Sequence, residues 1–205
     1  MREKEKSTQI IFVRHGKTDF PLDRIYCDDR EDPPLSVEGL QQAERAARLL
    51  KERMVAAIYA SPALRTRMTA EIIAQQVPRP LVYCEELRER RFGAWEGLYF
   101  HEIEAQYPEA YRRWKMDNAG FKPEGGESVF DLIERARVCL SNIAAAHAGE
   151  SVVVVTHVGP IRALVADVIG LPLSAYRVLT IDYTSLTAVA LKRSQNNLLY
   201  LNVVG

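Results

Sequence analysis

Short runs of apolar and β-branched residues alternate along the chain with stretches in which apolar residues recur at helical spacing. The first run is Ile10-Ile11-Phe12-Val13, which leads within three residues to a glycine. The run Ser151–Thr156 contains four consecutive valines, which is typical of a strand buried on both faces of a parallel sheet. By the same reasoning we expect further strands over 56–60, 81–83, 178–181, 185–191 and 198–204.

Helical periodicity fills the segments between these runs. Ser36 is suited to cap one helix, and Ser61-Pro62 is a good start for another that ends near Gln76. Ser128 with Asp131 predicts the start of a long helix, and we expect others near 100–114 and over 160–169. The helix after Ser36 carries its apolar residues roughly on one face: Val37, Leu40, Ala47, Leu50 and Met54.

This alternation predicts an α/β fold, namely a three-layer α/β/α sandwich around a mainly parallel sheet. The last two runs are joined by the short connection Asn196-Asn197 and could pair antiparallel at one edge of the sheet. A chain of 205 residues is long enough for one sizeable core. We therefore expect residues 1–205 to form a single domain, with a capping insertion at about 98–126.

The composition restricts the class of function. Lys and Arg together number 27, as do Asp and Glu, and this balance argues against a nucleic-acid or anionic membrane partner. No apolar run approaches the ~20 residues that span a bilayer, and the charged start of the chain lacks a signal-peptide pattern. Cys27, Cys84 and Cys139 form neither a metal-ligand pattern nor a disulfide framework. We expect a cytoplasmic protein without a metal ion.

Charged side chains gather where the predicted strands end. Arg14 and His15 follow the first strand, Arg65 lies one turn inside the helix after the second, and His157 follows the valine-rich strand. Parallel strands bring these residues to one edge of the sheet, where open α/β sheets bind ligands. The helix N-termini after the second and the valine-rich strands add N–H groups and partial positive charge. The sequence thus predicts a small cationic pocket suited to a phosphate group.

Arginine and histidine offer complementary chemistry at such a pocket. The guanidinium fork matches phosphate oxygens, and a neutral imidazole can act as a nucleophile. An ordinary histidine is largely neutral at pH 7, and flanking arginines lower the pKa of His15 further. These two residue types are therefore suited to phosphoryl transfer.

Four motifs together resemble those of one known family. The chain from about residue 9 to residue 190 is similar to the histidine phosphatase superfamily, in the cofactor-independent phosphatase branch related to phosphoglycerate mutase. Short chains of this type resemble α-ribazole-5′-phosphate phosphatases and broad-specificity sugar or glycerate phosphatases. The motifs occur in order as Arg14-His15-Gly16-x-Thr18, Ser61-Pro62-x-x-Arg65-Thr66-x-x-Thr69-Ala70, Leu87-Arg88-Glu89-x-x-Phe92-Gly93-x-Trp95-Glu96-Gly97 and Val155-Thr156-His157-x-Gly159-x-Ile161-Arg162-Ala163-Leu164.

The resemblance implies a role for each matching position. His15 would attack phosphorus and become a phosphohistidine, and Glu89 would protonate the leaving oxygen. Arg14, Arg65 and His157 would surround the phosphoryl oxygens, the histidine as an imidazolium, so that no metal ion or other cofactor is needed. Thr18 and the backbone N–H of Val158 are expected to contact the substrate.

Several positions depart from the family pattern. Lys17 replaces a common glutamate and adds a positive charge beside the nucleophile, and Pro21 replaces a common asparagine. Cys27 and Val158 each stand where glycine is frequent. None of these changes removes a core catalytic group, so we expect them to affect substrate specificity. Trp114 is predicted to be a packing residue, with the mouth of the pocket as an alternative place.

Three functions remain open from the sequence. The leading prediction is a phosphatase that hydrolyses a small phosphorylated metabolite. The first alternative is a phosphoglycerate mutase, although the short chain, which ends soon after its last strand, favours access for water. The second is a catalytically inactive phosphate-binding regulatory module, against which the complete set of Arg, His and Glu positions argues. An edge strand near the C-terminus would also permit a homodimer.

Overall fold

The computed structural model describes residues 7–26, 30–192 and 194–205, so the expectations for Cys27 lie outside the described residues. Within this part of the chain six strands form one sheet in the order β3-β2-β4-β1-β5-β6. Their bounds are β1 Thr8–Arg14, β2 Ala57–Ala60, β3 Leu81–Tyr83, β4 Ser151–Thr156, β5 Leu186–Leu191 and β6 Asn197–Val203. β1, β2, β3 and β4 are parallel, whereas β5 runs antiparallel to β1 and β6 antiparallel to β5.

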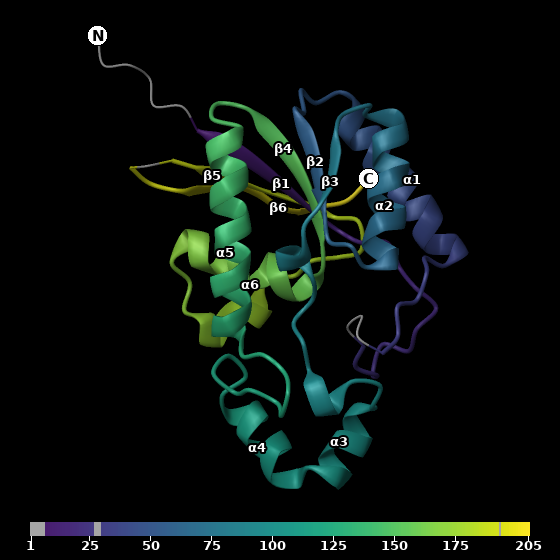
Figure 1. Ribbon diagram of the computed structural model, residues 1–205, viewed down its shortest axis with the longest axis vertical. Coiled ribbons are helices and arrows are strands. Elements are labelled where there is room, and N and C mark those ends of the chain that lie inside the picture. Colours follow the sequence, from purple (N-terminus) through teal and green to yellow (C-terminus); the bar gives the residue numbers. More distant parts are fainter. Residues whose placement is uncertain (1–6, 27–29, 193) are drawn as a thin grey trace.

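Helices cover both faces of this sheet (Figure 1). α1 (Val37–Lys51) and α2 (Leu64–Gln76) pack on one face, and α5 (Val129–Ala146) and α6 (Val158–Ile169) pack on the other. The predicted three-layer α/β/α sandwich is therefore confirmed. Its mainly parallel sheet and its antiparallel edge are confirmed as well.

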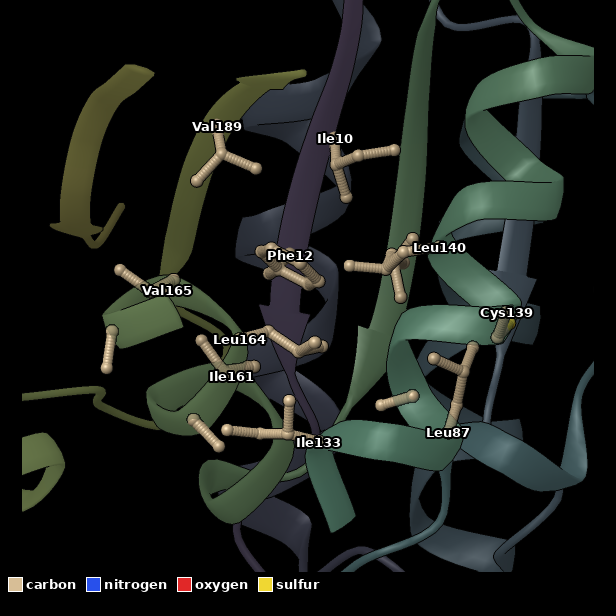
Figure 2. Packing of buried hydrophobic residues seen from close by; sticks show 14 of the residues in the cluster. Ile10, Phe12, Leu87, Ile133, Cys139, Leu140, Ile161, Leu164, Val165 and Val189 are labelled. Carbon is tan, nitrogen blue, oxygen red and sulfur yellow. The ribbon is translucent and has the colours of Figure 1, made fainter. Parts of the chain in front are cut away.

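The central strands are apolar throughout because each face of the sheet has its own core. In β1, Ile10 and Phe12 pack toward α5 and α6, as Figure 2 shows, while Ile11 and Val13 pack toward α1 and α2. The four valines of β4 alternate in the same way and all are fully buried. Since side chains alternate across a strand, a strand with two covered faces has no polar position. This is the physical reason for the valine run.

The helix starts follow the sequence signals in two of three cases. The Ser36 hydroxyl accepts a hydrogen bond from the Gly39 N–H at 3.0 Å, and Ser128 with Asp131 forms a capping box at the start of α5. Ser61 does not cap α2, which begins at Leu64. The buried face of α1 is narrower than the apolar face that we expected. Val37 is 74% exposed, and Met54, which lies beyond the helix, is 92% exposed.

The segment 178–181 is not a strand, so this prediction is wrong. A 3₁₀ helix, η3 (Leu173–Val178), occupies its start, and the chain then continues without regular secondary structure. The Leu179 carbonyl accepts from Arg162 Nε at 2.7 Å, and the Ile181 carbonyl accepts from Arg14 Nη1 at 2.8 Å. Arginine side chains thus satisfy the backbone groups that a neighbouring strand would otherwise satisfy.

Residues 98–126 lie beyond the carboxyl ends of the parallel strands, at the lower end of Figure 1. The single helix expected near 100–114 is two helices, α3 (Phe100–Gln106) and α4 (Pro108–Met116). They separate at Tyr107 because a residue before proline disfavours helical backbone. Trp114 is buried in a cluster of its own with Ile25, Trp95, Ile103 and Phe121, so it is a packing residue.

Within residues 7–26, 30–192 and 194–205, no helix combines the length and the apolar character required to cross a bilayer.

Candidate active site

A cavity of about 220 Å³ opens at the carboxyl ends of the parallel strands. Among the predicted site residues, five contribute to its lining: Arg14, His15, Arg65, Glu89 and Val158. His157 is fully buried behind this lining, and its ring centroid lies 5.3 Å from that of His15. The carboxyl ends of the parallel strands and the helices that follow them thus bring the two histidines and the two arginines to one place.

His15 is held as a neutral imidazole with one ring nitrogen available. Nδ1 lies 2.8 Å from the Gly16 carbonyl oxygen. Because a carbonyl can only accept, Nδ1 carries the proton and Nε2 keeps its lone pair. Burial lowers the pKa of His15 well below its ordinary value, and the charges of Arg65 and Arg14 lower it further. The expected effect of the flanking arginines is thus present, but burial is the larger cause.

His157 is also held as a neutral imidazole, whereas the resemblance implied an imidazolium around the phosphoryl oxygens. Arg65 Nη2 lies 2.9 Å from His157 Nδ1, and since a guanidinium can only donate, Nδ1 is the acceptor. The proton is therefore on Nε2, which donates to the Ser61 hydroxyl at 2.8 Å. Burial lowers the pKa of His157 well below its ordinary value, and Arg65 and His15 lower it further. In this arrangement His157 orients Arg65.

The start of α2 differs from the prediction in a way that involves Arg65. Both carboxylate oxygens of Asp32 lie 2.9 Å from the Leu64 nitrogen, so Asp32 accepts from the first helical N–H. One of these oxygens is also 3.5 Å from Arg65 Nη1. A carboxylate of the protein itself thus occupies a helix N-terminus that we expected to face the ligand. Apart from its aspartate-rich loop, no sequence signal marks Asp32.

Arg14 is fixed on two sides. Its Nη1 donates to the Ile181 carbonyl at 2.8 Å, and its guanidinium carbon lies 3.8 Å from the centroid of the Tyr183 ring. Its Nε is buried and has no hydrogen-bond partner among the described residues. A buried donor of this kind is costly unless an acceptor binds to it. Arg14 is therefore a preorganised donor in the cavity wall.

Glu89 faces the cavity from the loop after η1 (Glu85–Leu87). Its Oε1 accepts from the Arg90 N–H at 2.8 Å, and its Oε2 accepts from the Gly159 N–H at 3.2 Å, near the start of α6. Arg135 Nη2 donates to the Glu89 carbonyl at 2.8 Å and also pairs with Glu127. Both ends of Glu89 are thus fixed to helices on the same face of the sheet.

Of the two predicted substrate-binding residues, only Val158 lines the cavity, as the first residue of α6. Thr18 is 3% exposed, and its hydroxyl lies 3.3 Å from that of Tyr26, which does line the cavity. The Lys17 ammonium is 2.6 Å from a Glu38 oxygen, which raises the pKa of this lysine. Its charge is therefore paired on α1. Pro21 is exposed and precedes a lining residue, Leu22.

The cavity also contains residues to which the sequence analysis gave no role. Arg162 lies one turn inside α6, and Arg65 is the second residue of α2. Both stand near the start of a helix that follows a parallel strand, so the reasoning that located Arg65 also applies to Arg162. Tyr26 and Tyr183 stack against Arg65 and Arg14, respectively. Aromatic residues in irregular segments give no comparable sequence signal. The lining residues missed in this way include Tyr26, Arg162, Tyr176, Arg177 and Tyr183.

Comparison with known families agrees with this geometry. The profile of the histidine phosphatase superfamily (branch 1) matches residues 10–204. The chain belongs to the histidine phosphatase superfamily. Transfer of the phosphoryl group through a phosphohistidine is general for this family.

Several proteins that are similar to this chain are named as phosphatases of a particular substrate. Phosphoserine phosphatase 1 of Hydrogenobacter thermophilus is 31% identical over 196 residues, which are 95% of this chain and 92% of that protein. A metal-independent phosphoserine phosphatase of Arabidopsis thaliana is 38% identical over 161 residues, 77% of this chain and 67% of its own length. The structure of a mycobacterial glucosyl-3-phosphoglycerate phosphatase superposes with a TM-score of 0.87 and 28% identity, and the match covers 97% of this chain and 100% of that one.

Proposed function

We propose that this histidine phosphatase hydrolyses small phosphomonoesters through a phosphohistidine on Nε2 of His15. The observation that carries the proposal is the hydrogen bond from His15 Nδ1 to the Gly16 carbonyl. It leaves the Nε2 lone pair on a neutral ring whose cavity also contains Arg14, Arg65 and Glu89. These are a nucleophile, two fixed cations and a proton carrier in one place.

In the first step the Nε2 lone pair forms a bond to phosphorus while the ester P–O bond breaks. Arg14 and Arg65 offset the negative charge on the equatorial oxygens of the transition state. Glu89, in its protonated form, gives its proton to the departing alkoxide oxygen, so the products are an alcohol and the phosphoenzyme.

In the second step water attacks the phosphorus and the P–N bond breaks. The Glu89 carboxylate accepts a proton from the attacking water, and orthophosphate leaves. Glu89 is thereby returned to its protonated form and His15 to its neutral one. The bonds from Arg90 and Gly159 hold the carboxylate in place for both steps.

The reaction in this proposal uses no metal ion, and the protein acts in the cytoplasm on a phosphorylated metabolite. Arg14 and Arg65 supply the positive charge that a metal ion would otherwise supply. The name of the metal-independent relative from Arabidopsis thaliana supports this part of the proposal. The proposed location follows the sequence, in which three widely spaced cysteines form no disulfide framework.

The test is phosphate release from p-nitrophenyl phosphate and from a panel of sugar, glycerate and nucleoside phosphates, with and without EDTA. We expect steady release that EDTA leaves unchanged and that His15→Ala abolishes. His101→Ala is the matched control, because His101 is exposed and lies on α3, and it should keep full activity.

Two other results would overturn the proposal. Isomerisation of 3-phosphoglycerate with little release of phosphate would identify a mutase. Binding of inorganic phosphate without turnover of any ester would identify an inactive phosphate-binding module.

A further inference from the structure

Four arginines of the described cavity lining have guanidinium groups that the proposed reaction does not use. Of these, Arg24 pairs with Glu31 and Arg90 donates to backbone carbonyls, which leaves Arg162 and Arg177. Arg162 and Arg177 line the cavity together with Arg14, and Glu89 is the only carboxylate among the described lining residues. Neither Arg162 nor Arg177 forms an ion pair with a described acidic residue. The cavity therefore has more positive charge than a single phosphoryl group requires.

The two side chains differ in their contacts, because Arg162 is half-buried and hydrogen-bonded whereas Arg177 is exposed and contacts an aromatic ring. Arg162 donates through Nε to the Leu179 carbonyl at 2.7 Å, which leaves its two terminal nitrogens for other acceptors. The guanidinium carbon of Arg177 lies 4.8 Å from the centroid of the Trp114 ring, so a buried residue of α4 supports it. A restrained arginine such as Arg162 loses little conformational freedom when it binds an anion.

Hydrogen bonds place Arg162 near Arg14. Arg162 Nε donates to the Leu179 carbonyl, and Arg14 Nη1 donates to the Ile181 carbonyl two residues further along the chain. Arg177 belongs to η3, which ends directly before Leu179. Arg162 and Arg177 thus line the side of the cavity that α6 and η3 form, next to Arg14.

Other cations of this region lack this arrangement. Arg112 pairs with Glu109 on the exposed face of α4, and Lys122 pairs with Asp131. Neither Arg112 nor Lys122 is among the described residues that line the cavity. Arg112 and Lys122 thus form ion pairs with carboxylates of the protein, whereas Arg162 and Arg177 form none with the described acidic residues.

We propose that Arg162 and Arg177 bind a second anionic group on the substrate, such as a carboxylate or a second phosphate. This inference rests on the proposed function, which places the reacting phosphoryl group at His15. The guanidinium fork takes either kind of oxyanion, so the shared requirement is negative charge at the far end of the substrate. Apolar lining residues, among them Ile25 and Phe92, favour a short carbon skeleton between the two anions.

The experiment compares kcat/KM for substrates that differ in one group. One arm uses 3-phosphoglycerate against glycerol 3-phosphate for the carboxylate, and the other uses propanediol bisphosphate against propanediol monophosphate for the second phosphate. In at least one arm we expect kcat/KM to be about tenfold or more higher for the substrate that carries a second anionic group besides the reacting phosphate. Arg177→Gln and Arg162→Gln should each reduce that ratio by roughly fivefold or more, mainly through KM.

Arg112→Gln is the matched control and should keep the wild-type ratio, because Arg112 is exposed and already paired with Glu109. Arg177→Gln keeps the test valid if loss of the Leu179 contact prevents Arg162→Gln from folding. Preference ratios near one in both arms, or ratios unchanged in Arg177→Gln, would overturn the inference while leaving the phosphatase proposal intact. If no ester is hydrolysed, the proposed function fails, and the same ratios measured as dissociation constants by calorimetry still decide the inference.

Discussion

The backbone N–H of Gly159 donates to Oε2 of Glu89 at 3.2 Å, and a Cβ on Gly159 would lie only 2.1 Å from Oε1 of the same carboxylate. The proposed proton carrier therefore packs directly against the first turn of α6. A side chain at position 159 and a carboxylate at its present place exclude each other. This steric exclusion explains why the motif after His157 contains a glycine at position 159.

We expect Gly159→Ala to displace the Glu89 carboxylate and to lower kcat by roughly 10- to 100-fold, because general acid–base catalysis typically contributes 10²–10⁴-fold. The measurement is steady-state hydrolysis of p-nitrophenyl phosphate and of an alkyl phosphate. The alkyl ester should suffer more, since its leaving alkoxide has the greater need of a proton. The control is Glu89→Ala: in that background Gly159→Ala should have little further effect, and an undiminished second loss would contradict the steric account.

Ser61 is predicted to stabilise the fold through His157. Its hydroxyl accepts from His157 Nε2 at 2.8 Å, and both residues are fully buried. Ser61→Ala leaves a buried ring N–H without this acceptor, so the free energy of unfolding should fall by about 1–3 kcal/mol. Urea unfolding at pH 7 measures the change. Ser141→Ala, at an exposed position of α5, should stay within about 0.5 kcal/mol of wild type. Equal effects at the two positions would refute the role of Ser61.

The two buried histidines should make the protein less stable in mild acid. Their pKa values are lowered in the folded state, so from about pH 6.5 downward the unfolded chain binds protons that the folded protein does not. Each histidine therefore removes about 1 kcal/mol of stability between pH 6.5 and pH 5.5. Above the unfolded pKa both states are neutral and the effect vanishes.

Urea unfolding at these two pH values tests this expectation. His15→Asn and His157→Asn should each show a smaller difference between the two pH values than wild type, by about 1 kcal/mol. The exposed His101→Asn serves as the control. A pH dependence that is the same in wild type and in both variants would show that the histidines are protonated in the folded protein.

The elements of the fold could be predicted where one local signal determined them. The valines of β4 and the serine cap at Ser36 are examples, because burial on two faces and a cap hydrogen bond each leave a direct mark on the sequence. The segment 178–181 has the apolar pattern of a strand. Its carbonyls are taken by Arg14 and Arg162, which are distant in sequence, so no local pattern could show this.

The same distinction applies to the site. Arg14, His15, Arg65 and His157 could be placed together because parallel strands end at one edge of the sheet. Which of these side chains donates and which accepts each hydrogen bond could not be predicted from the sequence, because this depends on which atoms lie close together in space. Ser61 thus accepts a hydrogen bond from His157 instead of capping α2, and the distant residue Asp32 caps α2.

The most direct test of the account is to trap the phosphoenzyme. The enzyme is mixed with a phosphomonoester and denatured in base within a turnover, and its peptides are mapped by mass spectrometry. The account predicts a phosphoryl group on the peptide that contains His15, attached at Nε2, and none in His15→Ala. A phosphoryl group on any other residue, or full turnover in His15→Ala, would contradict it.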